Sequence, residues 1–579
     1  MKRNLLGLVA IGFVAVLVTS CGSKAPKEAR YIPKTASAVF VLDPGSMKDK
    51  LQKGGISVDT LLGRIFKSDS ADKADRDQLE AFRNNAGINW DNRFYFFFNP
   101  GTKQAELGGM SINMLANLSD AGKFEAWLKN DKEAKKHEVK KEKEYSYITP
   151  EPGTLISWTD KNILLTVYNA PAVKPYFDTI TMNYVVPEKT FNKDSAVKAE
   201  VAGYYTQKED ASLASVKAFS EMFKDKADGY FFSSTGSIAP ALKMMPLQLP
   251  KMEELLKDNY STATLTFENG KILVRSASHT NNMITSLLKQ YPGKPADLSL
   301  IEHYPSQHVN GFMVVAFNPE IFGGLFKQLE VESLINNMIA QTGFTVDNFY
   351  HSFKGDMAIV VSDLGTSAPE PQQRRDEKAL VPKKSIGKML LNVTVGNKTD
   401  FFKMMDKTVE LGYLKKEGNA YKAGDLLASL GFYVHGDEKN FILSSDSVLY
   451  AQYMAKTSKA ALNADVMSQA KGKTTVMYFD IANTIGAYAD ETEGSGFNSA
   501  MRKTKATFKD LIILSDNFNG KSINSTMEVR MQDSKQNSLV TLTSLLTDIA
   551  VDMRVAARRE KEAEDKMFPG GVPAIIRTN

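Results

Sequence analysis

Residues 38–51 read AVFVLDPGSMKDKL. A similar pattern recurs at residues 311–322, which read GFMVVAFNPEIF. In each stretch a run of strand-forming residues ends at Asp43 or Asn318, and a proline follows. The side-chain oxygen of either residue can accept hydrogen bonds from the unpaired amides of a first helical turn, and proline has no amide that needs a partner there. Each stretch therefore predicts a strand that passes into a helix, and the recurrence predicts an internal duplication.

The matches continue in the same order after these opening stretches. A glycine followed by an Asp-Asn pair occurs at 87–92 and again at 343–348, and predicts the end of one helix and the start of another. Dense apolar runs follow at 94–98 and 357–361. Because successive strand residues face opposite sides of a sheet, such runs predict strands that are covered on both faces.

The strongest turn signal also occurs twice. Asn-Gly stands between alternating apolar runs at 269–270 and at 519–520, and predicts two-residue hairpins because both residue types tolerate positive φ. The tetrapeptide Thr-Ser-Leu-Leu follows each hairpin, at 285–288 and 543–546, in a predicted helix. We therefore predict an α+β fold with two tandem homologous halves, each a mostly antiparallel sheet with packed helices.

The length of 579 residues exceeds what one core supports, and 43% hydrophobic with 24% charged residues is typical of a globular protein. A segment rich in Pro, Gln, Arg and Glu within the second half predicts a mobile loop, because it cannot bury enough apolar surface to order itself. The predicted parts are a signal peptide at 1–20, a tether at 21–30, a first repeat at 31–298, a second repeat at 299–553 with the mobile insertion at 362–384, and a charged C-terminal extension at 554–579.

The N-terminus carries the most specific signal in the chain. Lys2 and Arg3 precede an apolar run at 5–18, which is shorter than the roughly 20 residues of a membrane-spanning helix, and Cys21 follows shortly after it. This pattern resembles the lipobox of bacterial lipoproteins, in which the cysteine thiol takes a diacylglycerol thioether and becomes the new N-terminus. The resemblance implies a lipid attachment site at Cys21, and two or more acyl chains hold a protein stably on a membrane. The alternative is a plain secretory signal with an incidental cysteine.

Cys21 is the only cysteine, so its use for lipid excludes disulfides, thiolate nucleophiles and cysteine metal sites. Residues 22–24 lack the acidic side chains that often follow the lipidated cysteine of Bacteroidota lipoproteins carried to the outer face. By that resemblance we expect a lipid anchor in the cell envelope, on the periplasmic face of the outer membrane rather than the cell surface. The formal charge of +5 gives no electrostatic case for nucleic acid as a partner.

The sequence contains no pattern from which catalytic, cofactor-binding or metal-binding residues can be named. The closest histidines, His303 and His308, are five residues apart with Pro305 between them, which is the wrong spacing for two ligands on one helical face. Phosphate-loop, dinucleotide and nucleophile-elbow motifs are absent from the sequence, and Gly323-Gly324 predicts close helix packing. The six histidines are His137, His279, His303, His308, His351 and His435, and the carboxylate pairs Glu253-Glu254 and Asp490-Glu491 lie in polar stretches.

Short phrases along the chain resemble a known family. The segments at 31–34, 309–312, 317–320 and 353–356, together with the lipidated start, are similar to a Bacteroidota lipoprotein family of unknown function, of the type named domain of unknown function 4836. The resemblance implies an α+β envelope protein and supplies no substrate or catalytic residue.

We therefore expect a membrane-anchored envelope lipoprotein that acts as a non-enzymatic binding or scaffolding protein. Its expected partners are the membrane, through lipidated Cys21, and an envelope protein or glycan, with no cofactor. The expected recognition surface is the seam between the halves or the insertion at 362–384. Two alternatives stay open, which are an envelope hydrolase with an unfamiliar active site and a carrier of apolar cargo.

Overall fold

The computed structural model describes residues 25–65, 70–100, 109–130, 134–169, 176–178, 183–185, 192–238, 249–364, 387–488 and 496–567. The predicted signal peptide, Cys21 and nearly all of the predicted insertion lie outside these ranges. The chain forms two compact units. Unit 1 comprises Met1–Lys48, Asp77–Gln248 and Met252–Thr266, and unit 2 comprises Asp49–Arg76, Leu249–Lys251 and Phe267–Asn579.

Unit 1 contains an antiparallel sheet in the order β11-β10-β1-β2-β3-β7-β6-β5-β4. Its strands are β1 (Ala38–Leu42), β2 (Phe94–Asn99), β3 (Met110–Asn117), β4 (Lys140–Lys141), β5 (Ser146–Glu151), β6 (Thr154–Trp158), β7 (Asn162–Asn169), β10 (Gly229–Ser234) and β11 (Tyr260–Glu268), and a separate pair is β8 (Tyr176–Asp178) with β9 (Asn183–Val185). Its helices include η1 (Lys27–Tyr31), α5 (Ala121–Asn130), η3 (Ala134–Lys136), α6 (Lys193–Thr206), η4 (Glu209–Ala211), η5 (Leu213–Ser215), α7 (Lys217–Glu221), η6 (Met222–Lys224), η7 (Thr235–Ile238) and α9 (Met252–Leu256). Two further helices, α2 (Pro44–Lys53) and α4 (Ser70–Asn85), contain residues of both units, and the last two residues of β11 belong to unit 2.

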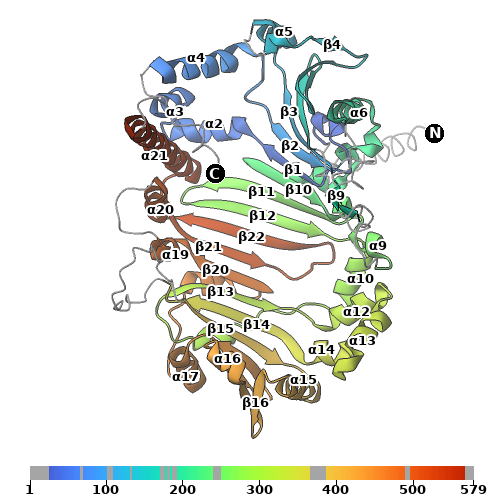
Figure 1. The fold of residues 1–579 in the computed structure, drawn as a ribbon, viewed down its shortest axis with the longest axis vertical. Helices are drawn as coiled ribbons and strands as arrows, with labels where there is room; N and C mark the ends of the chain where they lie inside the picture. Colours follow the sequence, from blue (N-terminus) through green and yellow to red (C-terminus); the bar gives the residue numbers. More distant parts are fainter. Residues whose placement is uncertain are drawn as a thin grey trace, which may run out of the picture. The chain divides into compact units, whose positions relative to one another are not determined.

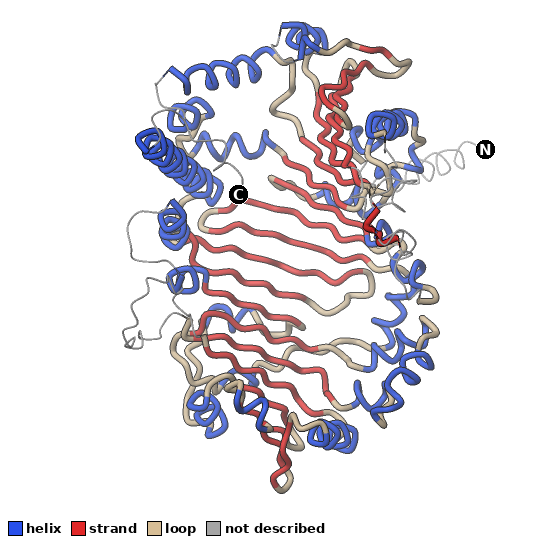
Figure 2. The backbone as a smooth tube through the Cα atoms, viewed as in Figure 1, coloured by secondary structure: helices blue, strands red, loops and turns tan. Residues whose placement is uncertain are grey.

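Unit 2 contains an antiparallel sheet in the order β12-β22-β21-β20-β13-β14-β15-β19-β18-β17-β16 (Figures 1 and 2). Its strands are β12 (Lys271–His279), β13 (Val309–Ala316), β14 (Phe353–Ser362), β15 (Lys388–Val395), β16 (Leu414–Glu417), β17 (Ala420–Ala423), β18 (Tyr433–Gly436), β19 (Asn440–Ser444), β20 (Thr475–Asp480), β21 (Phe508–Ser515) and β22 (Ser522–Met531). Together with the fold of unit 1, this confirms the predicted α+β class with a mostly antiparallel sheet and helices. The strand β12 falls within the predicted first repeat but pairs with β22, so the compact units and the predicted repeats divide the chain differently.

Several helices of unit 2 lie at the two ends of its strands (Figure 1). In that view α10, α12, α13 and α14 lie at one end, and α17, α19 and α20 lie at the other. The helices are α3 (Val58–Ile65), α10 (Asn282–Gln290), α11 (Ser299–Glu302), α12 (Glu320–Gln328), α13 (Glu332–Ile339), η8 (Ala340–Thr342), α14 (Val346–His351), α15 (Lys398–Glu410), α16 (Asp425–Ser429), α17 (Ser447–Ala455), α18 (Ala464–Gln469), α19 (Ile481–Tyr488), α20 (Gly496–Thr507) and α21 (Ser538–Met567). Among the residues that the structure describes, no helix is both long and apolar enough to cross a membrane.

The predicted passage from strand to helix is confirmed in both opening stretches. The Asp43 carboxylate accepts a hydrogen bond from the Ser46 amide at 3.2 Å, and α2 begins at Pro44. The Asn318 side chain accepts from the amide of Glu320, the first residue of α12, at 3.1 Å, but the N-cap position of that helix is Pro319, which has no side-chain cap. A side-chain cap such as that of Asp43 stabilises a helix by about 0.5–2 kcal/mol.

The predicted helix stop and restart occurs only in the second half. Gly343 has φ +75° at the end of η8, and α14 then begins behind a capping box of Thr345 and Asn348. Gly87 has φ +64° after α4, but the restart predicted after it is wrong. The backbone there is held instead by a bridge between Ile88 and Leu118, which commits it to strand-like pairing.

The predicted covering of both faces is complete on one face of the central strands and partial on the other. In β14, Ala358 and Val360 are buried, whereas Met357 and Ile359 between them are partly exposed. This alternation is the usual pattern of an antiparallel sheet with one face on a core. The buried face of β14 packs in a core with Phe312 and other apolar residues of β13, β20 and β21.

The prediction of close packing at Gly323-Gly324 is confirmed. A Cβ atom added to Gly323 would lie 2.6 Å from the Tyr350 hydroxyl, and one added to Gly324 would overlap the Tyr291 ring. These two glycines therefore let α12 approach its neighbours.

Candidate functional site

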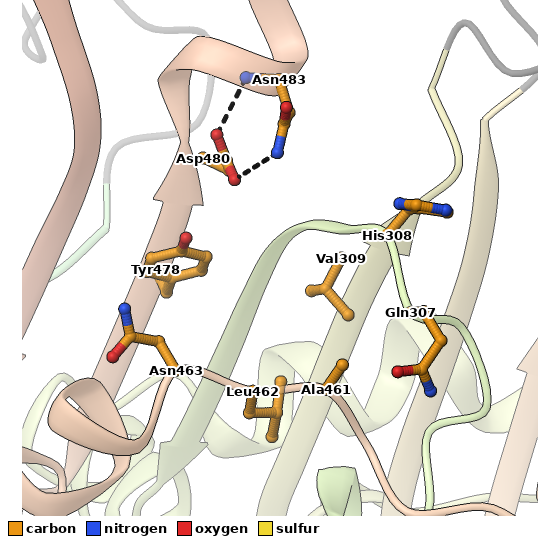
Figure 3. Close-up of a pocket in the computed structure, with 9 residues that line it drawn as sticks. All are labelled: Gln307, His308, Val309, Ala461, Leu462, Asn463, Tyr478, Asp480 and Asn483. Carbon is orange, nitrogen blue, oxygen red and sulfur yellow. Dashed lines mark hydrogen bonds between the residues drawn. The ribbon is translucent and has the colours of Figure 1, made fainter. Parts of the chain in front are cut away.

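A cavity of about 390 Å³ lies in unit 2, near the start of α19 (Figure 3). It is formed where the beginning of β13, the segment before α18 and the end of β20 meet. Amide, carboxylate, imidazole and phenol side chains surround a patch of aliphatic ones. The lining residues are Gln307, His308, Val309, Ala461, Leu462, Asn463, Tyr478, Asp480 and Asn483.

The Asp480 carboxylate is held in one orientation. Its Oδ1 accepts from the Asn483 backbone amide at 2.9 Å, and its Oδ2 accepts from the Asn483 side-chain amide at 2.8 Å (Figure 3). Asp480 thus caps α19, where the partial positive charge of a helix N-terminus favours an anionic side chain. A carboxylate has about four acceptor positions, so Asp480 keeps capacity to accept from a ligand.

Tyr478 supplies an aromatic ring and a neutral hydroxyl to the cavity. Burial raises the pKa of the Tyr478 phenol, and the negative charges of Asp480 and Asp510 raise it further. The phenol therefore keeps its proton at neutral pH and offers a hydroxyl to the cavity. Its ring stacks on Phe312, with centroids 5.5 Å apart, so the core fixes the ring position.

An ion-pair network centred on Arg530 lies near the Tyr478 phenol. Arg530 donates from Nη2 to Asp510 Oδ2 at 2.6 Å and from Nε to Asp510 Oδ1 at 2.5 Å, and its Nη1 donates to Asp465 Oδ2 at 2.7 Å. The hydrogen bond to Asp510 is the main reason that the pKa of Arg530 is raised. Because Asp465 lies in the first turn of α18 and Asn463 caps that helix, the network fixes the segment that carries Asn463.

His303 and His308, the two histidines closest in the sequence, do not share a site. His308 lines the cavity, and its imidazole extends away from Asp480 (Figure 3). His303 Nδ1 lies 3.1 Å from the Ser458 carbonyl. The other histidines with described ring contacts lie elsewhere in unit 2, where His435 Nε2 is 3.1 Å from Asp437 and His351 Nδ1 is 4.0 Å from Asp400.

Within the described ranges, no three His, Cys, Asp or Glu side chains are grouped so as to hold a metal ion. Glu253 and Glu254 lie in the first turn of α9. Asp490-Glu491 and the predicted lipid-attachment residue Cys21 lie outside the described residues.

Sequence reasoning missed the main polar residues of the cavity, which are Asn463, Tyr478, Asp480 and Asn483. One signal was available in the sequence, because Asp480 directly follows the apolar run 476–479 and stands three residues before an asparagine, in the position of a helix cap. The cavity itself carries no local signal.

A family model described as a domain of unknown function, DUF4836, matches residues 30–539. The chain belongs to this family. The match confirms the predicted family type, and the DUF4836 region contains all the residues of the cavity. The assignment to Bacteroidota stays a prediction.

No curated protein matches this DUF4836 chain. Among solved structures it is similar to crystal form I of TP0453, with 11% sequence identity and a TM-score of 0.21 over 46% of this chain and 85% of that chain.

Proposed function

We propose that this DUF4836 protein is a lipid-anchored protein of the cell envelope that binds a glycan without enzymatic conversion, through the cavity at Tyr478 and Asp480. The observation that carries the proposal is the side-chain chemistry of this cavity. Three side-chain amides, a fixed carboxylate and a phenol surround the aliphatic side chains of Val309 and Leu462.

Sugars match this chemistry because each hydroxyl both donates and accepts. Amides offer both functions, a carboxylate accepts from neighbouring hydroxyls, and an aromatic or aliphatic face packs against sugar C–H groups. The volume of about 390 Å³ falls within the range of roughly 300–1,000 Å³ that is usual for ligand sites. A ligand without hydroxyls would leave these polar groups unpaired, which disfavours apolar cargo.

The membrane anchor in this proposal rests on the N-terminal sequence. We propose that Cys21 carries the lipid and that the protein lies on the periplasmic face of the outer membrane. Cys21→Ser is then expected to release the protein from the membrane fraction. Wild-type protein that fractionates as soluble would contradict the anchor and would leave the glycan proposal untouched.

The proposal also includes the duplication, which the strand orders support. In chain order, strands β1 to β7 of unit 1 correspond to β13 to β19 of unit 2, and β10 and β11 correspond to β20 and β21. With this correspondence, the strands lie in the same order in both sheets. Nine strands of unit 1 thus match nine of the eleven strands of the unit 2 sheet, and unrelated sheets would rarely share such an order, so the correspondence favours a common origin of the two halves.

A buried polar pair at matching positions gives independent support for the duplication. Val39 stands four residues before Asp43, and it pairs with a residue of β2 that in turn pairs with Asn113 of β3. The Asn113 side chain lies 3.5 Å from the Tyr204 hydroxyl. Val314 stands four residues before Asn318 and pairs with Ala358 of β14, which in turn pairs with Asn392 of β15. The Asn392 side chain donates to the Tyr453 hydroxyl at 2.6 Å.

The glycan proposal is tested with the detergent-solubilised full chain. Soluble peptidoglycan fragments and polysaccharide released from lipopolysaccharide serve as probes, with calorimetry for binding and mass spectrometry for the recovered glycan. We expect saturable binding of at least one probe, recovered intact. Absence of binding to both would contradict the proposal, and recovery of shortened glycan would favour the hydrolase interpretation instead.

A further inference from the structure

A second hollow, of about 710 Å³, lies in unit 2 against one face of α15. Its wall on the other side is the turn at Gly343 and Phe344 that joins η8 to α14. We propose that this hollow binds a single-chain amphiphile that carries one carboxylate, such as a fatty acid. This site shares no residue with the glycan cavity, and the inference does not depend on the proposed function.

Aromatic rings form the apolar surface of the hollow, and the protein core below holds one of them in place. Phe402 is partly exposed and lies 5.9 Å, between ring centroids, from both Phe401 and Tyr421, which are buried in the core below. Phe344 provides a second partly exposed ring on the opposite wall. The two rings give an apolar chain a surface that the protein core holds in place.

Two lysines and two carboxylates line the hollow, so their formal charges sum to zero, but one carboxylate is already paired with a lysine outside the lining. Lys407 Nζ pairs with Glu410 at 2.6 Å. Asp406 accepts from Lys416 Nζ and from the Tyr421 hydroxyl, each at 2.7 Å. Partners therefore neutralise three of the four charged lining residues, and Lys403 is the fourth.

Lys403 is exposed and only weakly engaged. Its Nζ lies 3.4 Å from Asn348 Oδ1, at the long end of hydrogen-bond distances, and 5.9 Å from the centre of the Phe344 ring. An ammonium group has three donors, so Lys403 retains donors for a ligand. The ammonium stands at the edge of the aromatic surface, which places a positive charge beside an apolar wall.

This arrangement favours one negative charge over several. A single carboxylate can pair with Lys403, while its chain covers Phe344 and Phe402. A polyanion would bring further negative charge toward Asp406 and Glu410, so phosphate-rich ligands are disfavoured. The charge complementarity thus selects a monoanionic amphiphile.

Calorimetry of the full chain with dodecanoate, at concentrations below micelle formation, tests the inference. We expect saturable binding of one dodecanoate, and at least tenfold weaker binding of dodecanol and of butyrate. Lys403→Gln should weaken dodecanoate binding about tenfold, because a hydrogen bond to a charged group is lost. Phe344→Ala should weaken it by a similar factor through the apolar contact.

Lys415→Gln is the matched control, because Lys415 is also exposed but pairs with Asp425 outside the hollow. It should bind dodecanoate like the wild type. Equal affinity of wild type and Lys403→Gln, or equal affinity for dodecanoate and dodecanol, would overturn the inference. Binding to phosphatidylglycerol vesicles without binding to dodecanoate would overturn it as well. Unchanged glycan binding by Lys403→Gln separates this site from the glycan cavity.

Discussion

Each unit has an arginine that ties a strand to the start of a helix, but the two differ in burial. In unit 1, Arg93 Nε donates to the Asp43 carboxylate at 3.0 Å, and the two side chains are 31% and 21% exposed. In unit 2, Arg530 donates to Asp510 through two nitrogens, and the side chains are 15% and 1% exposed. The first pair includes the cap of α2, and the second supports the wall of the cavity at Tyr478 and Asp480.

An Arg–Asp pair therefore contributes differently to stability when its surroundings differ. Arg93 also lies over Phe223 and Tyr230, at 4.9 and 5.2 Å from the ring centres, so aromatic rings share the role of its counter-ion. Asp510 is nearly inaccessible, and water cannot replace its partner. Loss of Arg530 would leave a buried charge alone, whereas loss of Arg93 would leave Asp43 in contact with solvent and with the Ser46 amide.

The largest expected effect is that of Arg530→Gln. Removing one partner of a buried ion pair costs about 3–5 kcal/mol, because the remaining charge is desolvated. Hydrogen exchange of peptides from β20, β21 and β22 measures this effect, since all three tryptophans, Trp90, Trp127 and Trp158, lie in unit 1. Arg502→Gln, on an exposed side chain of α20, is the control and should leave the exchange unchanged.

The double variant Arg530→Met with Asp510→Leu sharpens the same comparison. Replacing both charges by apolar side chains removes the uncompensated carboxylate, and such replacements are often neutral for stability. Exchange in β21 and β22 should therefore return toward the wild-type rate. A double variant as unstable as Arg530→Gln would show that the geometry of the pair, rather than its charge balance, supports the sheet.

Arg93→Gln should cost less, about 1 kcal/mol, because the pair is partly exposed and solvent screens it. Urea unfolding followed by tryptophan fluorescence reports on unit 1 and measures this change. A loss as large as that of Arg530→Gln would contradict the difference in burial between the two pairs.

The smallest expected effect concerns pH. The pKa of Asp465 is lowered by the Gln469 side chain first, against some desolvation, and then by Arg530. A carboxyl group with a depressed folded-state pKa contributes stability above its unfolded pKa of about 3.9, and this contribution is lost as pH falls through the folded-state value. Asp465→Asn should thus have a flatter fall of unit 2 stability below about pH 4, as followed by hydrogen exchange of α18. An unchanged slope would mean that the contacts of the Asp465 carboxylate with Gln469 and Arg530 add no stability.

The sequence predicted the features that depend on neighbours in the chain. Asp43-Pro44 and Asn318-Pro319 are local signals within a few residues, and a helix starts directly after each, although only Asp43 caps its helix. The restart predicted after Gly87 failed because a distant partner, Leu118, engages Ile88. Local signals therefore hold until a long-range contact competes for the same backbone.

The cavity at Tyr478 and Asp480 could not be predicted, because its lining comes from three separate parts of the chain. Gln307, Asn463 and Tyr478 meet only after β13 and β20 have paired. The capping pattern of Asp480 with Asn483 was readable in the sequence, but it indicates a helix start and nothing about a ligand.

The central claim is tested most directly by comparing two capping aspartates. Asp480 caps α19 inside the cavity, and Asp446 caps α17 by accepting from the Leu449 amide at 2.7 Å, outside the cavity. Both Asp480→Ala and Asp446→Ala lose a cap, at a cost of about 0.5–2 kcal/mol. In calorimetry with the glycan fragment bound by the full chain, we predict about tenfold weaker binding for Asp480→Ala and wild-type affinity for Asp446→Ala. Wild-type affinity of Asp480→Ala would contradict the assignment of the cavity.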